Sequence, residues 1–417
     1  MSTAALFDSP WPAEDGGPAR LQTPRSGSAL ALKPGESLRC TSRSTLLSTM
    51  TVLGAPGEVF LLTHSALRAH IGLPTTACVE RIDPVSLKTV CRSPRLPGGP
   101  MWPGGMAVHG NGDLYVVYGR YAHRLNLQCD LLTSRKLPVN QPYNSFVVLA
   151  NGLLVTKNLS KTDAAVLSVL DPDALQLVGE GVSCPEPSVA RLSAVGNTIY
   201  VVGVRSIFRY HWDEMQSTLA LDHTWRHDYA TGTEQSFGWD VVLDGQDAWF
   251  MDNGDHRYRI RMMGAGVKAS ANRLIRVSLT DAADHQAWPI SGVPCGSITN
   301  PPLIDVQRQI VVAFDSANSY LRAWRFDRGQ RSLQPLWEKH PFGAASHMIL
   351  YPGTGELVVN DYRRLGEEVC VLNIETGAEL ARVRVGGLTQ GVVFPSPGWG
   401  RDFYWSSMGR LAHVVVE

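Results

Sequence analysis

The sequence lacks any long hydrophobic run. Its longest apolar stretches are short segments such as Leu114–Val117 and Ile310–Phe314, whereas a membrane-spanning helix needs roughly 20 apolar residues. Residues 1–20 do not combine a charged start with an apolar run, so we expect no secretory signal peptide. These absences predict a protein that neither crosses nor inserts into a membrane.

An excess of charge of either sign is also absent. The 38 basic residues balance 38 acidic ones without forming a basic stripe, which argues against a nucleic-acid partner. Seven scattered cysteines include no CxxC pair, and an odd number of isolated cysteines fits reduced thiols better than a disulfide framework. We therefore expect a cytoplasmic protein. Its oligomeric state cannot be deduced from the sequence.

What the sequence does contain is a repeat, which lets a chain of 417 residues avoid the size limit of a single core. Eight times, a short β-rich run meets a turn and a second β-rich run that ends in polar residues. Most of these turns contain glycine, which supplies the positive φ that tight hairpins need. The eight copies are TVLGAPGEVFLLTHS, MAVHGNGDLYVVYG, FVVLANGLLVTKN, RLSAVGNTIYVVGV, DVVLDGQDAWFMDN, LIDVQRQIVVAFDS, MILYPGTGELVVND and VVFPSPGWGRDFYWSS.

A second type of hairpin lies between these copies. Its clearest examples are VERIDPVSLKTV, LSVLDPDALQLV and VCVLNIETGAELARV. Two hairpins form one four-stranded antiparallel blade, whose strands are A to D from the channel outward. The pattern predicts an all-β fold, a β-propeller with about eight four-stranded blades. Seven blades are the alternative, if the terminal strands extend an existing blade.

The last blade is incomplete at the C-terminal end of the chain. Residues Val392–Glu417 supply only three strands, so the fourth must come from the N-terminal segment, either Ser28–Leu32 or Ser37–Thr41. Closure of this kind removes an exposed sheet edge. We assign residues 28–417 to the propeller domain. Residues 1–27, rich in Pro, Gly and Ser, are expected to form an N-terminal tail that lies on the surface.

Two of the repeats carry a resemblance to a known family. The segments YNSFVVLANGLLV and GWDVVLDGQDAWFMDNGDHR resemble calcium-dependent β-propellers of the gluconolactonase and paraoxonase type, in which Asn or Asp opens the innermost strand before a DG turn. Those propellers have six blades, so this sequence departs from them in blade number. The resemblance implies hydrolysis of a lactone or ester at the mouth of the central channel.

The register of the repeats places polar residues together. Residues that open strand A and residues that close strand B lie on one face of a propeller, so their side chains are expected to converge on one channel mouth. Carboxylate and amide oxygens are the ligands that Ca²⁺ prefers, which makes a divalent cation, Ca²⁺, the expected cofactor. The expected metal ligands are Asn144, Asp240, Asn253 and Asn300.

Other residues near the same mouth have side chains suited to catalysis or binding. A histidine or aspartate can act as a general base, and a lysine can bind an anion or form a Schiff base. The expected catalytic residues are His347, Asp252, Asp361, His64 and Lys157. The expected substrate-binding residues are Tyr143, Trp239, Trp102, Arg205 and Gln390.

These residues support more than one function. The leading hypothesis is an enzyme that acts on a small organic molecule, most simply by metal-assisted hydrolysis of a lactone or ester. One alternative is a lyase or isomerase with His and Asp as acid and base. Another is a non-enzymatic propeller that binds a ligand or a protein. Propellers host many chemistries, so the fold does not decide between these hypotheses.

Overall fold

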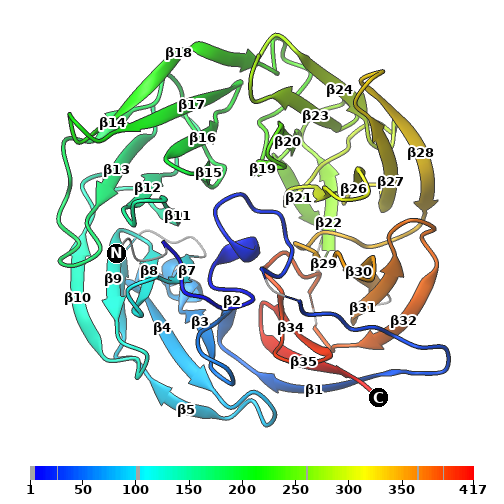
Figure 1. Cartoon of the computed structure of the whole chain (residues 1–417), viewed down its shortest axis with the longest axis horizontal. Coiled ribbons are helices and arrows are strands. Elements are labelled where there is room, and N and C mark those ends of the chain that lie inside the picture. Colours follow the sequence, from blue (N-terminus) through cyan, green and yellow to red (C-terminus); the bar gives the residue numbers. More distant parts are fainter. Residues whose placement is uncertain (1–4, 26, 100–103, 260–261, 364–365, 388) are drawn as a thin grey trace.

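The computed structural model describes residues 5–25, 27–99, 104–259, 262–363, 366–387 and 389–417. Eight antiparallel sheets form a closed ring around a central channel (Figure 1). The all-β propeller prediction is therefore confirmed, with eight blades rather than seven. Seven sheets have four strands, and blade I has a fifth because its outer edge is split into two short strands.

The blades follow one another along the chain, and the first strand of each is the innermost. The strands of blades I to IV are β2 (Leu47–Leu53), β3 (Val59–His64), β4 (Thr75–Ile82), β5 (Thr89–Arg92) and β6 (Leu96–Gly99); β7 (Gly105–Val108), β8 (Leu114–Tyr118), β9 (Tyr121–Leu125) and β10 (Leu131–Lys136); β11 (Tyr143–Val148), β12 (Leu154–Asn158), β13 (Val166–Leu170) and β14 (Val182–Ser183); β15 (Ser193–Val195), β16 (Thr198–Val202), β17 (Ser206–Asp213) and β18 (Thr218–Asp228).

Blades V to VIII complete the ring. Their strands are β19 (Val242–Leu243), β20 (Asp247–Met251), β23 (Arg273–Ser278) and β24 (His285–Pro289); β25 (Leu303–Asp305), β26 (Ile310–Asp315), β27 (Tyr320–Asp327) and β28 (Ser332–Lys339); β29 (Ile349–Tyr351), β30 (Glu356–Arg363), β31 (Gly366–Asn373) and β32 (Glu379–Arg384); β33 (Ser396–Pro397), β34 (Asp402–Ser407), β35 (Arg410–Val416) and β1 (Leu38–Ser44).

The ring has two faces, which differ in the loops that they carry. On the upper face, strand A begins and strand B ends in every blade. On the lower face lie the tight A–B turns, where Gly112 and Gly152 adopt positive φ values of 89° and 87°. Only glycine takes this conformation without steric cost, which explains the recurrence of glycine in the repeats.

Blade VIII is built from both ends of the chain. Strand β1 pairs antiparallel with β35 over its whole length, from Leu38 opposite Val416 to Ser44 opposite Arg410. The expected closure by an N-terminal strand is confirmed, with Ser37–Thr41 as the better of the two candidate segments. Because β1 pairs with β35, β35 has a neighbouring strand on each side and is not an exposed sheet edge where the two ends of the chain meet.

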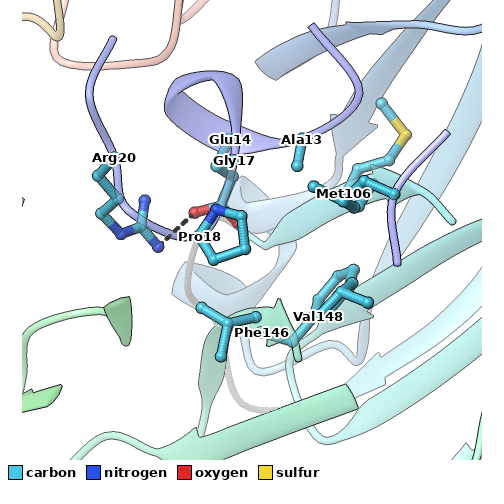
Figure 2. A pocket seen from close by; sticks show the side chains of 11 residues that line it. Ala13, Glu14, Gly17, Pro18, Arg20, Met106, Phe146 and Val148 are labelled. Atoms are coloured by element: carbon cyan, nitrogen blue, oxygen red, sulfur yellow. Dashed lines mark hydrogen bonds and ion pairs between the residues drawn. The ribbon is translucent and has the colours of Figure 1, made fainter. Parts of the chain in front are cut away.

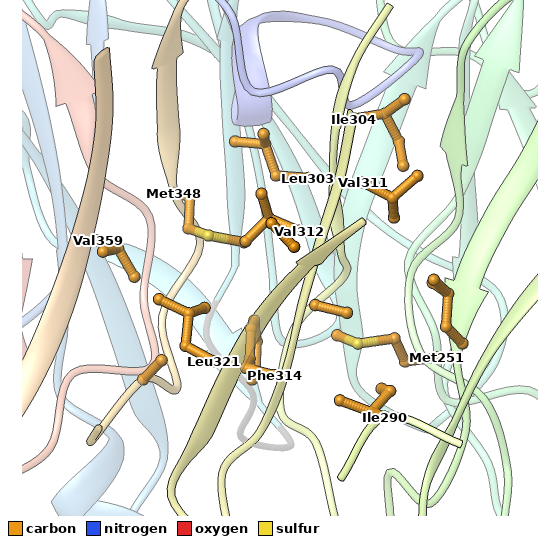
Figure 3. Close-up of a cluster of buried hydrophobic side chains, with 14 of the residues drawn as sticks. Met251, Ile290, Leu303, Ile304, Val311, Val312, Phe314, Leu321, Met348 and Val359 are labelled. Carbon is orange, nitrogen blue, oxygen red and sulfur yellow. The ribbon is translucent and has the colours of Figure 1, made fainter. Parts of the chain in front are cut away.

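Apolar side chains fill the spaces between neighbouring blades. Figure 3 shows the largest of these clusters, in which Met251, Leu303, Val312 and Val359 from three successive blades pack together. Each blade thus buries both of its faces against its neighbours, which is how a long chain stays stable without one large core.

Two elements interrupt the regular blades on the upper face. The B–C connection of blade I contains the short 3-10 helix η2 (Ala66–Ile71), and that of blade V contains an extra hairpin of β21 (His256–Arg259) and β22 (Met262–Gly266). Across the described ranges, no helix has the length and apolar character to cross a membrane.

The N-terminal segment is not a tail on the surface, and that expectation is wrong. Residues 5–25, which we call the plug, enter the centre of the ring and carry the 3-10 helix η1 (Glu14–Gly16) (Figure 1). Trp11 is 1% exposed and Gln22 is fully buried. The composition suggested a tail because it is rich in Pro and Gly, but in the plug these residues shape tight turns inside the channel.

Candidate functional site: the plugged central channel

The plug is hydrogen-bonded to the inner strands of five blades. The backbone N–H groups of Leu53, Val108 and Leu350 donate to plug carbonyls at 2.7 to 2.8 Å, and those of Ala194 and Leu243 do so at 2.8 and 2.9 Å. Leu53, Val108 and Leu243 end their strands, so the plug enters from the lower face. It satisfies backbone groups that would otherwise face an open channel.

The plug backbone is held in an unusual conformation at three positions. Asp15, Arg20 and Gln22 have positive φ values of 52°, 56° and 57°, a region that costs free energy for residues other than glycine. The side chain of Gln22 explains one of them, because its amide donates to the carbonyl of Pro302 and accepts from the N–H of Met348, both at 2.8 Å. Such contacts hold the plug in one arrangement.

A buried charge network lies at the centre of the plug. The guanidinium of Arg20 donates to carboxylate oxygens of Glu14 and Asp15, at 3.0 Å in each case (the Glu14 bond is drawn in Figure 2). It also donates to the hydroxyl of Ser145 on β11 at 3.0 Å. All three charged residues are at most 5% exposed.

Two strand-opening residues of blades IV and V extend this network. The Arg191 guanidinium lies 3.5 Å from the Glu14 carboxylate and 3.5 Å from that of Asp240. The backbone N–H of Arg191 donates to Asp240 at 2.7 Å, and its guanidinium also lies over the ring of Phe394, 4.5 Å from the centroid. Asp240 was expected to bind a metal, but its two oxygens are engaged by Arg191.

His347 of blade VII completes the network. Its Nδ1 lies 2.9 Å from an Asp15 oxygen, and its ring stacks on Phe394 with 3.9 Å between centroids. Burial by itself raises the pKa of Asp15, but His347 and Arg20 outweigh it and hold this pKa below its usual value. His347 is fully buried, so the expected role as a general base would require the plug to leave.

Burial also shifts the pKa values of two neighbouring groups. It raises the pKa of Glu14, against the opposing effects of Arg20 and Arg191. It lowers the pKa of Lys157 to about 8, and the Lys157 ammonium is 3.4 Å from the carbonyl oxygen of Ser188. Lys157 was expected to be catalytic, but it is 1% exposed and lies inside blade III.

One small cavity lies beside the plug among the described residues. It is lined by Glu14, Pro18, Arg20, Met106 and Phe146 and has a volume of about 10 Å³ (Figure 2). That is room for at most about one water molecule. A small-molecule substrate therefore does not fit in this cavity.

Two other expected catalytic residues are held within their own blades. Asp252 accepts from the guanidinium of Arg273 at 2.7 Å and from the amide of Gln235 at 3.0 Å. Asp361 lies 2.9 Å from Arg382 and accepts from the N–H of Gly343 at 2.8 Å. Both carboxylates are fully buried, so the structure places them in structural ion pairs rather than at one shared centre.

Two of the expected metal ligands are engaged by backbone groups. Asn253 accepts from the N–H of Ser236 at 2.9 Å, and Asn300 donates to the carbonyl of Ala345 at 2.5 Å. Asn144 is 2% exposed. Within the part of the chain that the structure describes, no group of three or more His, Cys, Asp or Glu side chains is placed to hold a metal ion. Asn253 and Asn300 bond to backbone groups, while the buried side-chain nitrogen of Asn144 has no hydrogen-bond partner among the described residues. Binding of a shared cation therefore stays a prediction.

The expected substrate-binding residues are similarly dispersed. Tyr143 is buried and its hydroxyl accepts from the N–H of Val139 at 3.2 Å. Trp239 stacks on Phe237 with 5.9 Å between centroids. The side chain of Gln390 is 1% exposed and donates to the carbonyl of Gly343 at 2.9 Å. Each of these side chains is thus engaged in contacts within the fold.

The remaining expected site residues have different surroundings. Trp102 lies outside the described residues. Arg205 donates to the carbonyl of Ala230 at 3.3 Å and lines an open cavity of about 420 Å³ with Glu186 and Arg226. His64 is 6% exposed and lines a cavity of about 260 Å³ in blade I. Burial lowers the pKa of His64 to about 4, so its imidazole is neutral at pH 7.

Sequence reasoning missed the plug residues and one buried acid. A signal for the plug was present, because apolar residues such as Trp11 and Leu21 are atypical of a solvated tail. Glu367 on β31 gave no signal, since it lies inside an ordinary strand. It is fully buried and accepts from the amide of Asn360 at 2.9 Å and from the N–H of Gly391 at 3.0 Å.

Burial raises the pKa of Glu367 to about 8, which predicts a pH-dependent stability. Between pH 5 and 8 the folded chain holds a proton that the unfolded chain has released. This contribution to the free energy of unfolding is complete below the pKa that Glu367 has in the unfolded chain. It is lost as the pH rises from there through 8, by up to about 1.4 kcal/mol per pH unit. We expect Glu367→Gln to remove that slope from the free energy of unfolding, measured by urea denaturation at pH 5.5, 7 and 8.5.

The exposed carboxylate Glu180 provides the control for this measurement. The Glu180→Gln variant should keep the wild-type dependence on pH. If Glu367→Gln and wild type showed parallel curves, Glu367 would be ionised in the folded protein and the prediction would be wrong.

Comparison with known proteins identifies the fold but no family. No family model and no curated protein matches the chain. Among solved structures, Saccharomyces cerevisiae Sqt1 aligns with a TM-score of 0.60 at 9% identity, covering 92% of this chain and 99% of that chain. The Dos1 propeller aligns with a TM-score of 0.59 at 9% identity, covering 94% and 96%.

A bacterial protein shows the same likeness. BamB from Moraxella catarrhalis aligns with a TM-score of 0.55 at 12% identity, covering 91% of this chain and 99% of that chain. At such identities the likeness concerns the fold alone. The chain is thus similar to β-propellers over nearly its whole length, and its function must be argued from its own residues.

Proposed function

We propose that this chain is a non-enzymatic binding propeller, a rigid ring that presents its surface to a protein partner. The observation that carries the proposal is the plug. The centre of the channel is closed by residues of the same chain, and Asp240 and His347 are already paired with Arg191 and Asp15.

The buried ion pairs support the same conclusion. Asp252 and Asp361 are neutralised by Arg273 and Arg382, so neither carboxylate needs a cation for charge compensation. A group that works as a general base must be within reach of its substrate, and these two carboxylates are fully buried. A binding surface, by contrast, needs only a rigid scaffold.

Calcium-assisted hydrolysis of a lactone or ester is the competing hypothesis, and enzyme assays separate the two. We expect the purified full-length chain to hydrolyse a panel of aliphatic lactones and aryl esters no faster than buffer, with Ca²⁺ or with EGTA. A ligand that binds the folded state raises the melting temperature. Since the proposed binding propeller has no Ca²⁺ site, we expect Ca²⁺ to leave the melting temperature unchanged.

Chelator-sensitive hydrolysis would contradict the proposal, provided that Asp252→Asn removed the activity while the circular dichroism spectrum stayed native. A lyase or isomerase would appear as turnover that EGTA leaves intact and that His347→Gln abolishes.

The seven cysteines are all free thiols, which supports a cytoplasmic location as part of the proposal.

A further inference from the structure

Among the described residues, four exposed aliphatic side chains lie in two neighbouring loops on the upper face of blade I. Leu46, Leu67, Ile71 and Leu73 are 56%, 60%, 72% and 46% exposed. Leu46 precedes β2, and the other three lie in or just after η2, so all four belong to loops of the upper face. Scattered exposed aliphatic residues are ordinary, but four within one pair of loops mark a candidate contact surface.

Next to these side chains is a cavity of about 260 Å³. Its walls combine Leu46 and Leu67 with three arginines, Arg68, Arg92 and Arg95, and no carboxylate lines it. The whole chain is electrically balanced, so this local excess of positive charge is a property of the cavity. We call the cavity and the four exposed aliphatic residues the blade I patch.

The arginines of the blade I patch are only partly neutralised. Arg92 is 59% exposed in its side chain and lies 3.7 Å from Glu80, but Glu80 is already engaged by Arg43 at 2.7 Å. The Nε of Arg68 is buried and has no hydrogen-bond partner. A buried donor without an acceptor is costly, and the charge of Arg68, which lines the cavity, favours an anionic group there.

The outer edge of blade I places two of these arginines. Strands β5 and β6 both pair with β4 and are separated by a break at Ser93–Arg95. The hydroxyl of Ser93 accepts from the N–H of Val79 at 3.0 Å, which fixes this break. Arg92 ends β5 and Arg95 is the last residue of the break. Both line the cavity, as does Arg68 from η2.

We propose that the blade I patch is the docking site for an acidic segment of a partner protein, one that carries Asp or Glu beside leucine-like side chains. The inference rests on the proposed function and locates the partner's binding site on the ring. The arginines of the patch favour acidic residues in the partner by charge complementarity. Leu67, Ile71 and Leu73 favour aliphatic residues in the partner by apolar contact. No Phe, Tyr or Trp side chain lines the cavity, and its one ring is the imidazole of His64. The cavity therefore offers little of the aromatic surface on which the bases of single-stranded RNA stack.

The test is a selection with the full-length chain from a displayed library of random peptides about 12 residues long, roughly three helical turns. Enriched peptides are synthesised with a fluorescein label, and binding is measured by anisotropy in 0.15 M salt. We expect the enriched sequences to combine acidic and aliphatic residues. We expect Arg68→Glu with Arg95→Glu to weaken binding at least about tenfold, equivalent to about 1.4 kcal/mol, and Ile71→Asp to do the same.

Matched controls lie elsewhere on the ring. Met215 is 97% exposed, and Arg331 is 58% exposed in its side chain beside Asp284. Met215→Asp and Arg331→Glu should leave peptide binding within about twofold of wild type, since surface changes away from a contact have small effects. Melting temperatures of all variants report whether the ring is intact.

Any of the following outcomes would contradict the proposed docking site. Enriched peptides that lack acidic residues, or that bind the charge-reversed variant as tightly as wild type, would place the interface elsewhere while leaving a binding propeller intact. A library that yields no enriched peptide would also reject the patch. Tighter binding of a fluorescein-labelled oligouridine, lost in the same arginine variants, would assign the patch to nucleic acid. The proposed function fails separately, through the hydrolysis assays.

Discussion

A chain truncated to residues 45–417 is expected to lose the folded propeller. It lacks β1, whose seven residues pair with β35 from Leu38 to Ser44, and it therefore leaves β35 as an open edge. An unpaired edge strand is a template for association between chains. We expect this variant to aggregate during purification, whereas the wild-type chain gives a cooperative unfolding transition by circular dichroism.

Two further chains separate β1 from the plug. Residues 28–417 keep β1 but lack the plug, so this chain should still close the ring and unfold at a lower temperature. In the full chain, Ser37 and Glu417 exchange backbone hydrogen bonds at 2.9 and 3.0 Å. A permuted chain that starts at Leu47 and joins Glu417 to Ser37 by a loop of about two to five residues should therefore regain a folded ring.

The permuted chain is the decisive comparison, because it restores β1 without the plug and without the original N-terminus. If residues 45–417 formed a monomer as stable as wild type, closure by β1 would be unnecessary. If the permuted chain aggregated like the truncated one, the loss would be due to the plug rather than to the missing strand.

Arg20→Ala is expected to lower the free energy of unfolding by about 3 to 5 kcal/mol. Arg20 is 2% exposed and bonds to Glu14 and Asp15. Its removal leaves two buried carboxylates short of a cation, and neither can reach water while the plug stays in place. Buried unpaired charge is among the largest single costs in a folded protein. Chemical denaturation at pH 7 measures the loss.

Arg25 provides the matched control at the end of the plug. It is exposed, and its guanidinium donates to the carbonyl of Phe7 at 3.1 Å. Arg25→Ala should change the free energy of unfolding by no more than about 0.5 kcal/mol. Arg20→Lys keeps the positive charge but loses the forked geometry, so its effect should lie between those of the other two variants. A loss below about 1 kcal/mol for Arg20→Ala would mean that the network does not hold the plug.

Two of the predicted site residues lie at the strand ends where the repeat placed them, but their contacts differ from those expected. Asp252 directly follows β20 and Asp240 precedes β19, as the repeat predicted. The sequence gives no indication that Arg273 would reach Asp252 or that Arg191 would reach Asp240. Those arginines come from strands and loops whose separation along the chain varies from blade to blade, so spacing alone does not reveal the pairs.

The sequence by itself determined the blades, their number and the closure of the ring. These features follow from local rules, namely alternating apolar strands, glycine at the turns and a missing fourth strand that only the N-terminal segment could supply. Local rules act over a few residues and repeat eight times, so each copy reinforces the others.

Only the tertiary structure decided what fills the channel. Glu14, Asp15 and Arg20 read as a polar tail, because no nearby residue specifies their burial. Their partners Ser145, Arg191 and His347 belong to three different blades and come together only when the ring closes. The plug is buried, its charges are paired and three of its residues adopt positive φ values because of contacts between distant parts of the chain. No sequence pattern of fixed spacing reveals such contacts.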